Sequence, residues 1–512
     1  MIFQKEGIKM YSNYYTDNMK PEELEMLKEI RTVDGLLEYC LEAFGEREAI
    51  TSGGKTVTYK EFYEDVELTR GFLVSNGINK GDHVGIMLKN EYDFMRVYMA
   101  TVTLGCVAVL VPMQTPVENV LPLCKGFDVN MLVHSRVFGG AYKAMNPSIP
   151  VFSQDEVTST DKADKCGDIT PDTPATIIFT GGTTGKSKGV LLSHGNLMRG
   201  TVSSAYGTRN GFFARYYAII PFTHVFGLIR SGLAAFYTGS YLFMCEDMKN
   251  IFKDLPVAKP TYLILVPGLA ELVWSIMAQR GKEAVGGQLD VIICGASAVP
   301  QKLVDRLAQF DVMLHPGYGL TESSNLVSGN VYPDKYPGSV GRAYGYQELK
   351  VVDGELWLKG ENVMLGYYND PKANEEAFCD GWFKTGDLVD IDDEGNIYIV
   401  GRIKNVIILD NGENVSPEAI EDKLCELPFI QAAFAYEGKN DAGKPIIAVQ
   451  IFPAQAALKA MNCEDPLALI QSAVDKFNAS VPSYMRVAKV TLRDEDFPRS
   501  GSMKIIRNQV QV

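Results

Sequence analysis

A Gly/Thr-rich loop between two apolar runs is the feature that most limits how this chain can fold. The loop, residues 180–189, reads T-G-G-T-T-G-K-S-K-G and lies between the apolar runs 175–179 and 190–192. Its glycines let backbone N–H groups approach oxyanions, its hydroxyls donate further hydrogen bonds, and its lysines supply positive charge. The loop therefore predicts a phosphate cradle, and chemistry on a nucleoside triphosphate is the first hypothesis.

This loop differs from a Walker A motif in its first residue and in the segment that follows. A Walker A motif needs G-x-x-x-x-G-K-[ST] and opens a helix. Here Thr180 stands at the first glycine, and the apolar run after Gly189 favours a strand. Strand, loop, strand is typical of a flap over phosphates, and the alternative interpretation is a Gly-rich hairpin turn.

The composition is that of a globular protein with several cores. The chain has 512 residues, 46% hydrophobic and 22% charged, and a net charge of −14, which argues against general nucleic-acid or anionic-membrane binding. Nine cysteines without a C-x-x-C pair and five histidines without metal-ligand spacing favour reduced thiols over disulfides or zinc. The N-terminus lacks the pattern of a signal peptide, and no apolar run reaches about 18 residues. We expect a cytoplasmic protein with no transmembrane segment.

Alternating helical and β patterns predict the fold class. From residue 59 the helix predicted at 60–76 leads to a strand at 83–88. This alternation continues through later strands such as 291–294, which indicates α/β layers with largely parallel sheets. After Gly338 short alternating strands, at 348–352, 355–359, 387–391 and 396–400, predict a small β-barrel-like region, and near Arg402 the pattern becomes α+β. We expect a large N-terminal α/β domain at 1–402 and a small mobile α+β domain at 403–512.

Five further runs carry residues suited to a nucleotide site. Tyr318 offers a face for a base, Thr321 and Glu322 are hard oxygen ligands for phosphate and Mg²⁺, and Asp387 could accept ribose hydroxyls. Each run also has a purely structural interpretation: a packed histidine for 221–227, tight turns for 294–298, 315–323 and 381–387, and a surface lysine for 498–504. The runs are P-F-T-H-V-F-G (221–227), C-G-A-S-A (294–298), H-P-G-Y-G-L-T-E-S (315–323), G-W-F-K-T-G-D (381–387) with G-R-I-K (401–404), and P-R-S-G-S-M-K (498–504).

Taken together and in this order, these runs resemble the adenylate-forming superfamily of acyl-CoA synthetases, peptide-synthetase adenylation domains and firefly luciferase. The resemblance extends from about Tyr59 to Lys504. It implies a large N-terminal domain, a small mobile C-terminal domain, and a two-step reaction. A carboxylate attacks the α-phosphate of ATP, pyrophosphate leaves, and a thiol then takes the acyl group from the adenylate. Charge stabilisation and positioning carry the first step, and domain rotation exposes the adenylate to the thiol.

The same resemblance implies a role for each matching residue. Glu322 would bind Mg²⁺, Thr321 the α-phosphate, and Asp387 with Arg402 the ribose. Lys504 would bridge the substrate carboxylate and the α-phosphate, Lys404 would be the hinge, and Gly412 would face the thiol channel. The loop residues implied to grip the β- and γ-phosphates are Thr180, Gly181, Gly182, Thr183, Thr184, Gly185, Lys186 and Lys188. Those implied around adenine are Tyr318, Gly319, Gly295, Ala296 and Ser297, and those implied around the acid are His224, Phe226, Gly227, Gly295, Gly317, Gly319 and Leu320.

Two further features of the sequence favour particular classes of substrate and acceptor. The T-G-G-T-T-G loop and N-G-E-N-V-S-P-E at 411–418 resemble bacterial long-chain fatty acyl-CoA ligases. No acid lies at 225–229, where amino-acid-activating members carry an aspartate, and an unpaired ammonium would be costly. We therefore expect a fatty or aryl acid, with coenzyme A as acceptor. The alternatives are the phosphopantetheine of an acyl carrier protein, an enzyme that stops at or oxidises the adenylate, and a non-catalytic nucleotide sensor.

Overall fold

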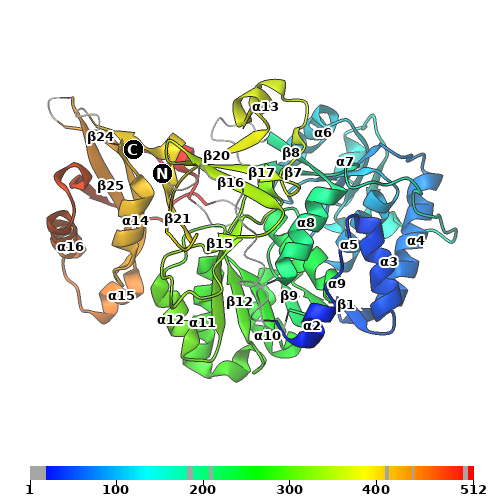
Figure 1. The fold of residues 1–512 in the computed structure, drawn as a ribbon, viewed down its shortest axis with the longest axis horizontal. Coiled ribbons are helices and arrows are strands. Elements are labelled where there is room, and N and C mark those ends of the chain that lie inside the picture. The colour runs from blue at the N-terminus through cyan, green and yellow to red at the C-terminus, as the bar shows by residue number, and fades with distance from the viewer. Residues whose placement is uncertain (1–18, 181–187, 207–210, 410–413, 441–442, 500–504) are drawn as a thin grey trace.

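The computed structural model describes residues 19–180, 188–206, 211–409, 414–440, 443–499 and 505–512. Two large sheets with helices around them build the N-terminal part of the chain (Figure 1). The predicted α/β class, with a second, smaller α+β domain, is confirmed. Within the described residues, no helix is both long enough and apolar enough to cross a membrane.

The first sheet has nine strands, and its central strands are parallel. The order is β15-β14-β13-β12-β11-β9-β10-β1-β2, with antiparallel pairing only at β2, β14 and β15. Its central strands are short apolar runs with both faces covered, as parallel sheets require. The strands are β1 (Glu48–Ser52), β2 (Lys55–Thr58), β9 (Arg215–Ala218), β10 (Tyr241–Met244), β11 (Tyr262–Leu265), β12 (Val291–Cys294), β13 (Met313–Tyr318), β14 (Ser328–Gly329) and β15 (Arg342–Ala343).

The second sheet has seven strands, and the two strands on either side of the predicted phosphate loop, β7 and β8, lie near one edge. Its order is β18-β8-β7-β4-β3-β5-β6, parallel from β7 to β6 and antiparallel at β8 and β18. The strands are β3 (His83–Met87), β4 (Val107–Leu110), β5 (Val129–His134), β6 (Val151–Ser153), β7 (Pro174–Thr180), β8 (Lys188–Ser193) and β18 (Gly366–Tyr367).

Helices cover both sheets, and several begin at side-chain caps. Thr58 and Glu61 form a capping box at α4, so the helix begins one residue before the predicted range 60–76, and Ser193 with Asn196 caps α8. The helices are α2 (Pro21–Glu25), α3 (Val33–Phe44), α4 (Tyr59–Ser75), α5 (Tyr92–Thr103), α6 (Val117–Gly126), α7 (Ala141–Ala144), α8 (His194–Ala205), α9 (Ala234–Tyr237), α10 (Ile251–Ala258), α11 (Pro267–Arg280) and α12 (Gln301–Ala308).

The region after Gly338 is an antiparallel sheet of five strands. The pairing runs β16-β17-β20-β19, with β21 on β20. β20 is longer than the predicted strand 387–391 because it begins at Trp382, so the K-T-G-D run lies inside a strand. The elements are β16 (Gln347–Val352), β17 (Glu355–Gly360), α13 (Pro371–Ala377), β19 (Phe378–Cys379), β20 (Trp382–Ile391) and β21 (Ile397–Arg402).

The chain after Arg402 forms a small α+β unit with its own core, drawn orange to red in Figure 1 beside the five-stranded sheet. Gly401 meets this unit closely, since a Cβ there would lie 2.2 Å from Ser416 Oγ. The elements are β22 (Ile407–Ile408), β23 (Asn414–Val415), α14 (Pro417–Cys425), β24 (Ile430–Lys439), β25 (Pro445–Pro453), α15 (Gln455–Ala460), α16 (Pro466–Ser480) and β26 (Val487–Leu492).

Candidate active site

The predicted phosphate loop joins two antiparallel strands. β7 and β8 pair along their length, and Thr180 faces Lys188 at the end of the hairpin where the loop begins. The predicted strands on either side of the loop are therefore confirmed. Thr180 and Lys188 stand at the two ends of the loop, whereas Gly181, Gly182, Thr183, Thr184, Gly185 and Lys186 lie outside the described residues.

A tyrosine that the sequence analysis missed links this hairpin to Glu322. The Lys188 ammonium lies 4.4 Å from the centroid of the Tyr367 ring, and the Tyr367 hydroxyl donates to Glu322 Oε1 at 2.9 Å. β18 holds Tyr367 in place because it pairs with β8, with Tyr367 opposite Val190. Burial and the Glu322 charge raise the pKa of Tyr367, so the phenol stays a donor at neutral pH. The G-Y-Y-N run at 366–369 was the only signal for this residue.

Glu322 and Thr321 lie in a short 3₁₀ turn (Thr321–Ser323) that follows β13. The two residues after this turn, Ser324 and Asn325, have φ values of 52° and 75°, a left-handed conformation that is costly without glycine. A Cβ at Gly319 would lie 1.5 Å from the Asn325 carbonyl oxygen, so only glycine fits there. The strained backbone at Ser324 and Asn325 thus holds Thr321 and Glu322 just after the end of β13.

One carboxylate at this turn suits Mg²⁺ bound together with phosphates. Mg²⁺ commonly takes one or two protein carboxylates and completes its shell with phosphate oxygens and water. Tyr367 occupies one oxygen of Glu322, and the other makes no hydrogen bond within the described part of the chain. Those same residues contain no group of three or more metal-binding side chains, so a site made by protein alone is absent there.

Three residues from separate runs of the sequence meet at Asp387. This carboxylate is 2% exposed and accepts hydrogen bonds from Tyr318 Oη at 2.5 Å and from Arg402 Nε at 2.6 Å. Asp387 and Arg402 face each other directly in the β20–β21 pairing. Burial and the Asp387 charge raise the pKa of Tyr318, which keeps its phenol protonated. The arrangement offers a fixed, buried acceptor beside an aromatic ring.

Small residues at the ends of β12 and β13 leave space next to this cluster. A Cβ at Gly295 would lie 2.9 Å from the Gly317 carbonyl oxygen and 3.8 Å from Phe226 Cζ, so these three residues are neighbours. Ala296 has a φ of 68°, a conformation that alanine rarely adopts, and Ser297 follows it in the same turn. Leu320 precedes the Thr321 turn, and its N–H donates to Ser323 Oγ.

His224 stands just before a π-helix (Phe226–Leu233), an element that the sequence analysis did not predict. His224 Nδ1 accepts a hydrogen bond from the Phe226 N–H at 3.2 Å, which fixes the ring at the start of the helix. Gly227 is required here because a Cβ would lie 2.3 Å from the Pro221 carbonyl oxygen. π-Helical turns are rare and are frequent at functional sites.

Two family models match this chain along most of its length. The model described as AMP-binding enzyme matches residues 37–368, and the model described as AMP-binding enzyme C-terminal domain matches residues 404–512. The chain belongs to the AMP-binding enzyme family. The names of its relatives support the AMP-forming acid–thiol ligase that the resemblance implied.

Relatives of this AMP-binding enzyme include ligases for different acids. The 2-succinylbenzoate–CoA ligase of Bacillus cytotoxicus is 27% identical over 485 residues, which cover 91% of this chain and 95% of the relative. A long-chain-fatty-acid–CoA ligase, FadD15 of Mycobacterium bovis, is 27% identical over 449 residues, covering 74% of each chain.

Solved structures support the fold. The o-succinylbenzoate CoA synthetase of Bacillus subtilis with its acyl-adenylate intermediate has a TM-score of 0.80 at 24% identity, covering 93% of this chain and 97% of that one. The anthranilate CoA ligase AuaEII with anthranoyl-AMP has a TM-score of 0.82 at 18% identity, covering 93% and 96%. At these identities the likeness shows the shared fold alone.

Three of the site residues predicted for this AMP-binding enzyme belong to the part of the chain after Arg402. Lys404 lies in an exposed 3₁₀ turn (Ile403–Asn405) directly after β21. Gly412 and Lys504 lie outside the described residues. The segments flanking residues 500–504 pair with each other through a β-bridge between Arg499 and Ile505.

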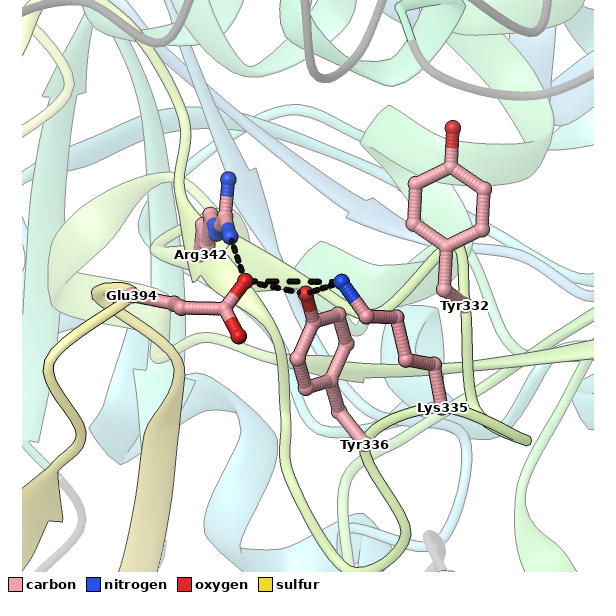
Figure 2. Close-up of a pocket in the computed structure, with 5 residues that line it drawn as sticks. All are labelled: Tyr332, Lys335, Tyr336, Arg342 and Glu394. Carbon is pink, nitrogen blue, oxygen red and sulfur yellow. Dashed lines mark hydrogen bonds and ion pairs between the residues drawn. The ribbon is translucent and has the colours of Figure 1, made fainter.

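A cavity of about 470 Å³ lies away from all the residues that the sequence predicted (Figure 2). Figure 2 shows Glu394, from the β20–β21 turn, accepting hydrogen bonds from Tyr336 at 2.5 Å and from Arg342 at 3.1 Å. Lys335 and Tyr332 complete the lining. These contacts join the loop after β14 to the five-stranded sheet, so we assign them a structural role.

Proposed function

We propose that this enzyme activates a carboxylic acid without an α-amino group, aryl or aliphatic, and passes it to coenzyme A. The observation that carries the site assignment is the meeting of Tyr318, Asp387 and Arg402 at one buried carboxylate, next to the Glu322–Tyr367–Lys188 chain that reaches the phosphate loop. A ribose acceptor, a base platform and a metal carboxylate at the mouth of a phosphate loop are the groups that ATP needs.

In this proposal each cluster performs one part of adenylate formation. Asp387 accepts the ribose hydroxyls, with Arg402 holding the carboxylate, and Tyr318 stacks on adenine above Gly295, Ala296 and Ser297. Thr321 would donate to the α-phosphate, and Glu322 would hold Mg²⁺, whose positive charge would stabilise the pyrophosphate as it leaves. The loop that begins at Thr180 and ends at Lys188 binds the β- and γ-phosphates.

The proposed acyl pocket lies between the π-helix and the ends of β12 and β13. His224, Phe226 and Gly227 form its helical wall, and Gly295, Gly317, Gly319 and Leu320 form the opposite wall. The names of the relatives, which include 2-succinylbenzoate, anthranilate and long-chain fatty acid ligases, support both aryl and aliphatic acids. No acidic side chain lies at 225–229 to pair with an ammonium group.

The second half-reaction is assigned to the part of the chain after Arg402. We place the domain boundary between Arg402 and Ile403, with Lys404 as the hinge, Lys504 as the lysine that clamps the substrate carboxylate, and Gly412 on the path of the thiol. Nine free cysteines favour a reducing compartment such as the cytoplasm.

AMP release tests the proposal directly. Purified protein with ATP, Mg²⁺ and a panel of fatty and aryl acids should form AMP in a reaction that needs both the acid and coenzyme A. Acyl-adenylate that accumulates on the enzyme without transfer to coenzyme A would point to a carrier protein as acceptor. ADP in place of AMP would contradict the function.

A further inference from the structure

Arg230 is a buried cation without a carboxylate partner, and it lies on the helix that borders the proposed acyl pocket. The residue is 3% exposed. Its guanidinium donates to the Ser204 carbonyl oxygen at 2.7 Å and to Tyr344 Oη at 3.3 Å, whereas Nε is buried and makes no hydrogen bond. In the described part of the chain no Asp or Glu lies within ion-pair distance of it. A buried charge left in this state is costly.

Arg70 shows what a purely structural buried arginine looks like in this protein. It is 1% exposed and likewise has no carboxylate partner among the residues that the structure describes. Its Nε donates to the Ala163 carbonyl oxygen at 2.9 Å, its NH group donates to Thr103 Oγ1 at 3.2 Å, and none of its buried nitrogens is left without a hydrogen bond. Arg230 differs because it keeps an unused donor.

The π-helix places Arg230 on the same side as Phe226. Arg230 follows Phe226 by four positions, which is close to one helical turn. Phe226 reaches Gly295, whose neighbour is Gly317. The helix therefore runs from the proposed pocket mouth at Phe226 inward to Arg230.

β13 also passes close to Arg230. Tyr344 Oη, which accepts a hydrogen bond from Arg230, would lie 2.2 Å from a Cβ at Gly329, and Gly329 pairs with Gly317 of β13. His315 and Gly317 share one face of the strand because side chains alternate. Burial lowers the pKa of His315 to about 4, its hydrogen bond to the Asn330 carbonyl oxygen opposes this shift, and the positive charge of Arg230 adds to it. His315 is thus neutral at pH 7, and Arg230 supplies the positive charge at this level.

The two walls give a similar depth. Two residues of strand advance about 6–7 Å, and four residues of a π-helix, which rises less per residue than an α-helix, advance somewhat less than about 6 Å. An acid whose reacting carboxylate lies above Gly317 would therefore bring its other end to Arg230 after a short chain or one aromatic ring. A long alkyl tail would instead bury hydrocarbon against the unpaired charge.

We propose that the acid activated by this enzyme carries a second anionic group, a carboxylate, which Arg230 binds at the inner end of the acyl pocket. The unused Nε donor and the adjacent NH group can face the two oxygens of a carboxylate, the geometry that a guanidinium favours. The inference rests on the proposed function and names the substrate class of that site: a compact dicarboxylic acid, aryl or aliphatic.

Matched pairs of acids test the inference on the unmodified enzyme. Glutaric, adipic and pimelic acids, and benzoic acids with a second carboxyl or carboxyalkyl group, are each compared with their monomethyl esters by AMP release. We expect kcat/KM for the best diacid to exceed that of its ester by about 100-fold or more. Diacids no better than their esters would overturn the inference while leaving the proposed function intact, and AMP from no acid would overturn both.

Arg230→Gln then tests the residue, with Arg70→Gln as the matched control. Arg230→Gln should remove the preference for the diacid over its ester while leaving KM for ATP unchanged. Arg70→Gln should lower the melting temperature and keep the preference. If Arg230→Gln fails to fold, Arg230→Lys keeps the charge but not the paired donors, and it should lower the ratio of the two kcat/KM values at least 10-fold. A preference that survives in a folded Arg230 variant contradicts the proposal.

Discussion

The phenol of Tyr318 donates a hydrogen bond to the carboxylate of Asp387, and the two oxygens lie 2.5 Å apart. Tyr318 ends β13 of the nine-stranded sheet, whereas Asp387 lies in β20 of the five-stranded sheet. The bond therefore joins two sheets at the proposed nucleotide site. It also means that the proposed ribose acceptor is already oriented before a nucleotide binds.

Asp387→Asn should weaken ATP binding strongly. The change removes a charged acceptor held by Arg402, and hydrogen bonds to charged groups contribute about 1.5–3 kcal/mol each. We expect KM for ATP to rise about 10- to 150-fold, with a smaller effect on KM for the acid. Initial rates of AMP release at varied ATP measure this, and an unchanged KM for ATP would remove Asp387 from the ribose site.

Tyr318→Ala and Tyr318→Phe should separate stacking from the hydrogen bond. Stacking of a base on an aromatic ring contributes about 1–3 kcal/mol, so Tyr318→Ala should raise KM for ATP by about 5- to 150-fold. Tyr318→Phe keeps the ring, and Arg402 still holds Asp387, so its KM for ATP should stay within about threefold of the unmodified enzyme. Equal losses in both variants would argue that the hydroxyl, and not the ring, carries the role.

Tyr367→Phe should raise the Mg²⁺ requirement. The hydroxyl orients Glu322, and loss of such a supporting partner typically costs about 10-fold or more in metal affinity or activity. Tyr368→Phe is the control, since its hydroxyl donates to Asp128 and not to Glu322. AMP release at varied Mg²⁺ should shift for Tyr367→Phe alone, and equal curves for both variants would refute the role of Tyr367.

Gly317→Ala should change KM for the acid with little effect on stability, whereas Gly319→Ala should destabilise the fold. A Cβ at Gly317 meets its first neighbour at 3.6 Å, so stability should change by about 0.5 kcal/mol or less while KM for the acid rises. A Cβ at Gly319 would lie 1.5 Å from a backbone oxygen, so this variant should lose about 3 kcal/mol or more. Urea unfolding and acid titrations measure both, and a stable Gly319→Ala would contradict the packing described here.

Two buried histidines should make the fold sensitive to acid. Burial lowers the pKa of His194 and of His315 from 6.5 to about 4. The unfolded chain therefore binds protons between about pH 6.5 and 4 that the folded chain does not, so stability is full above pH 6.5 and falls as the pH drops towards 4. Each histidine should contribute about 3 kcal/mol to this loss.

Urea midpoints measured from pH 7.5 to 4.5 should show that slope, and a His194→Gln variant should lose part of it. His83→Gln serves as the control, because His83 is 9% exposed whereas His194 is fully buried. A flat profile, or equal slopes in the unmodified protein and His194→Gln, would contradict the assignment.

Local sequence patterns predicted much of the fold. The helix at 60–76 and the strand at 291–294 were predicted because apolar spacing and caps decide such elements. The π-helix at 226–233 was missed, since its apolar run does not distinguish a π-helix from other helices. The start of β20 at Trp382 was missed because pairing with β17 extends the strand through a Gly-containing run.

In the candidate site, too, some residues were predicted from the sequence and others were found only in the structure. Tyr318, Asp387 and Arg402 stand in distinctive short runs, so the sequence pointed to them, and the structure brings them together. Tyr367 and Arg230 lie outside the runs that the sequence analysis selected. Their importance comes from contacts between segments far apart in the chain, such as the pairing of β18 with β8, which no local pattern encodes.

The direct pairing of Asp387 with Arg402 has a consequence for the order of events during turnover. Both residues precede Lys404, so rotation about the proposed hinge would leave their contacts with the ribose unchanged while the C-terminal unit moves. The adenylate would remain tethered by its nucleoside between the two half-reactions. Hydrolytic loss of the activated acid would then depend on how fast the thiol arrives and not on how firmly the C-terminal unit is closed.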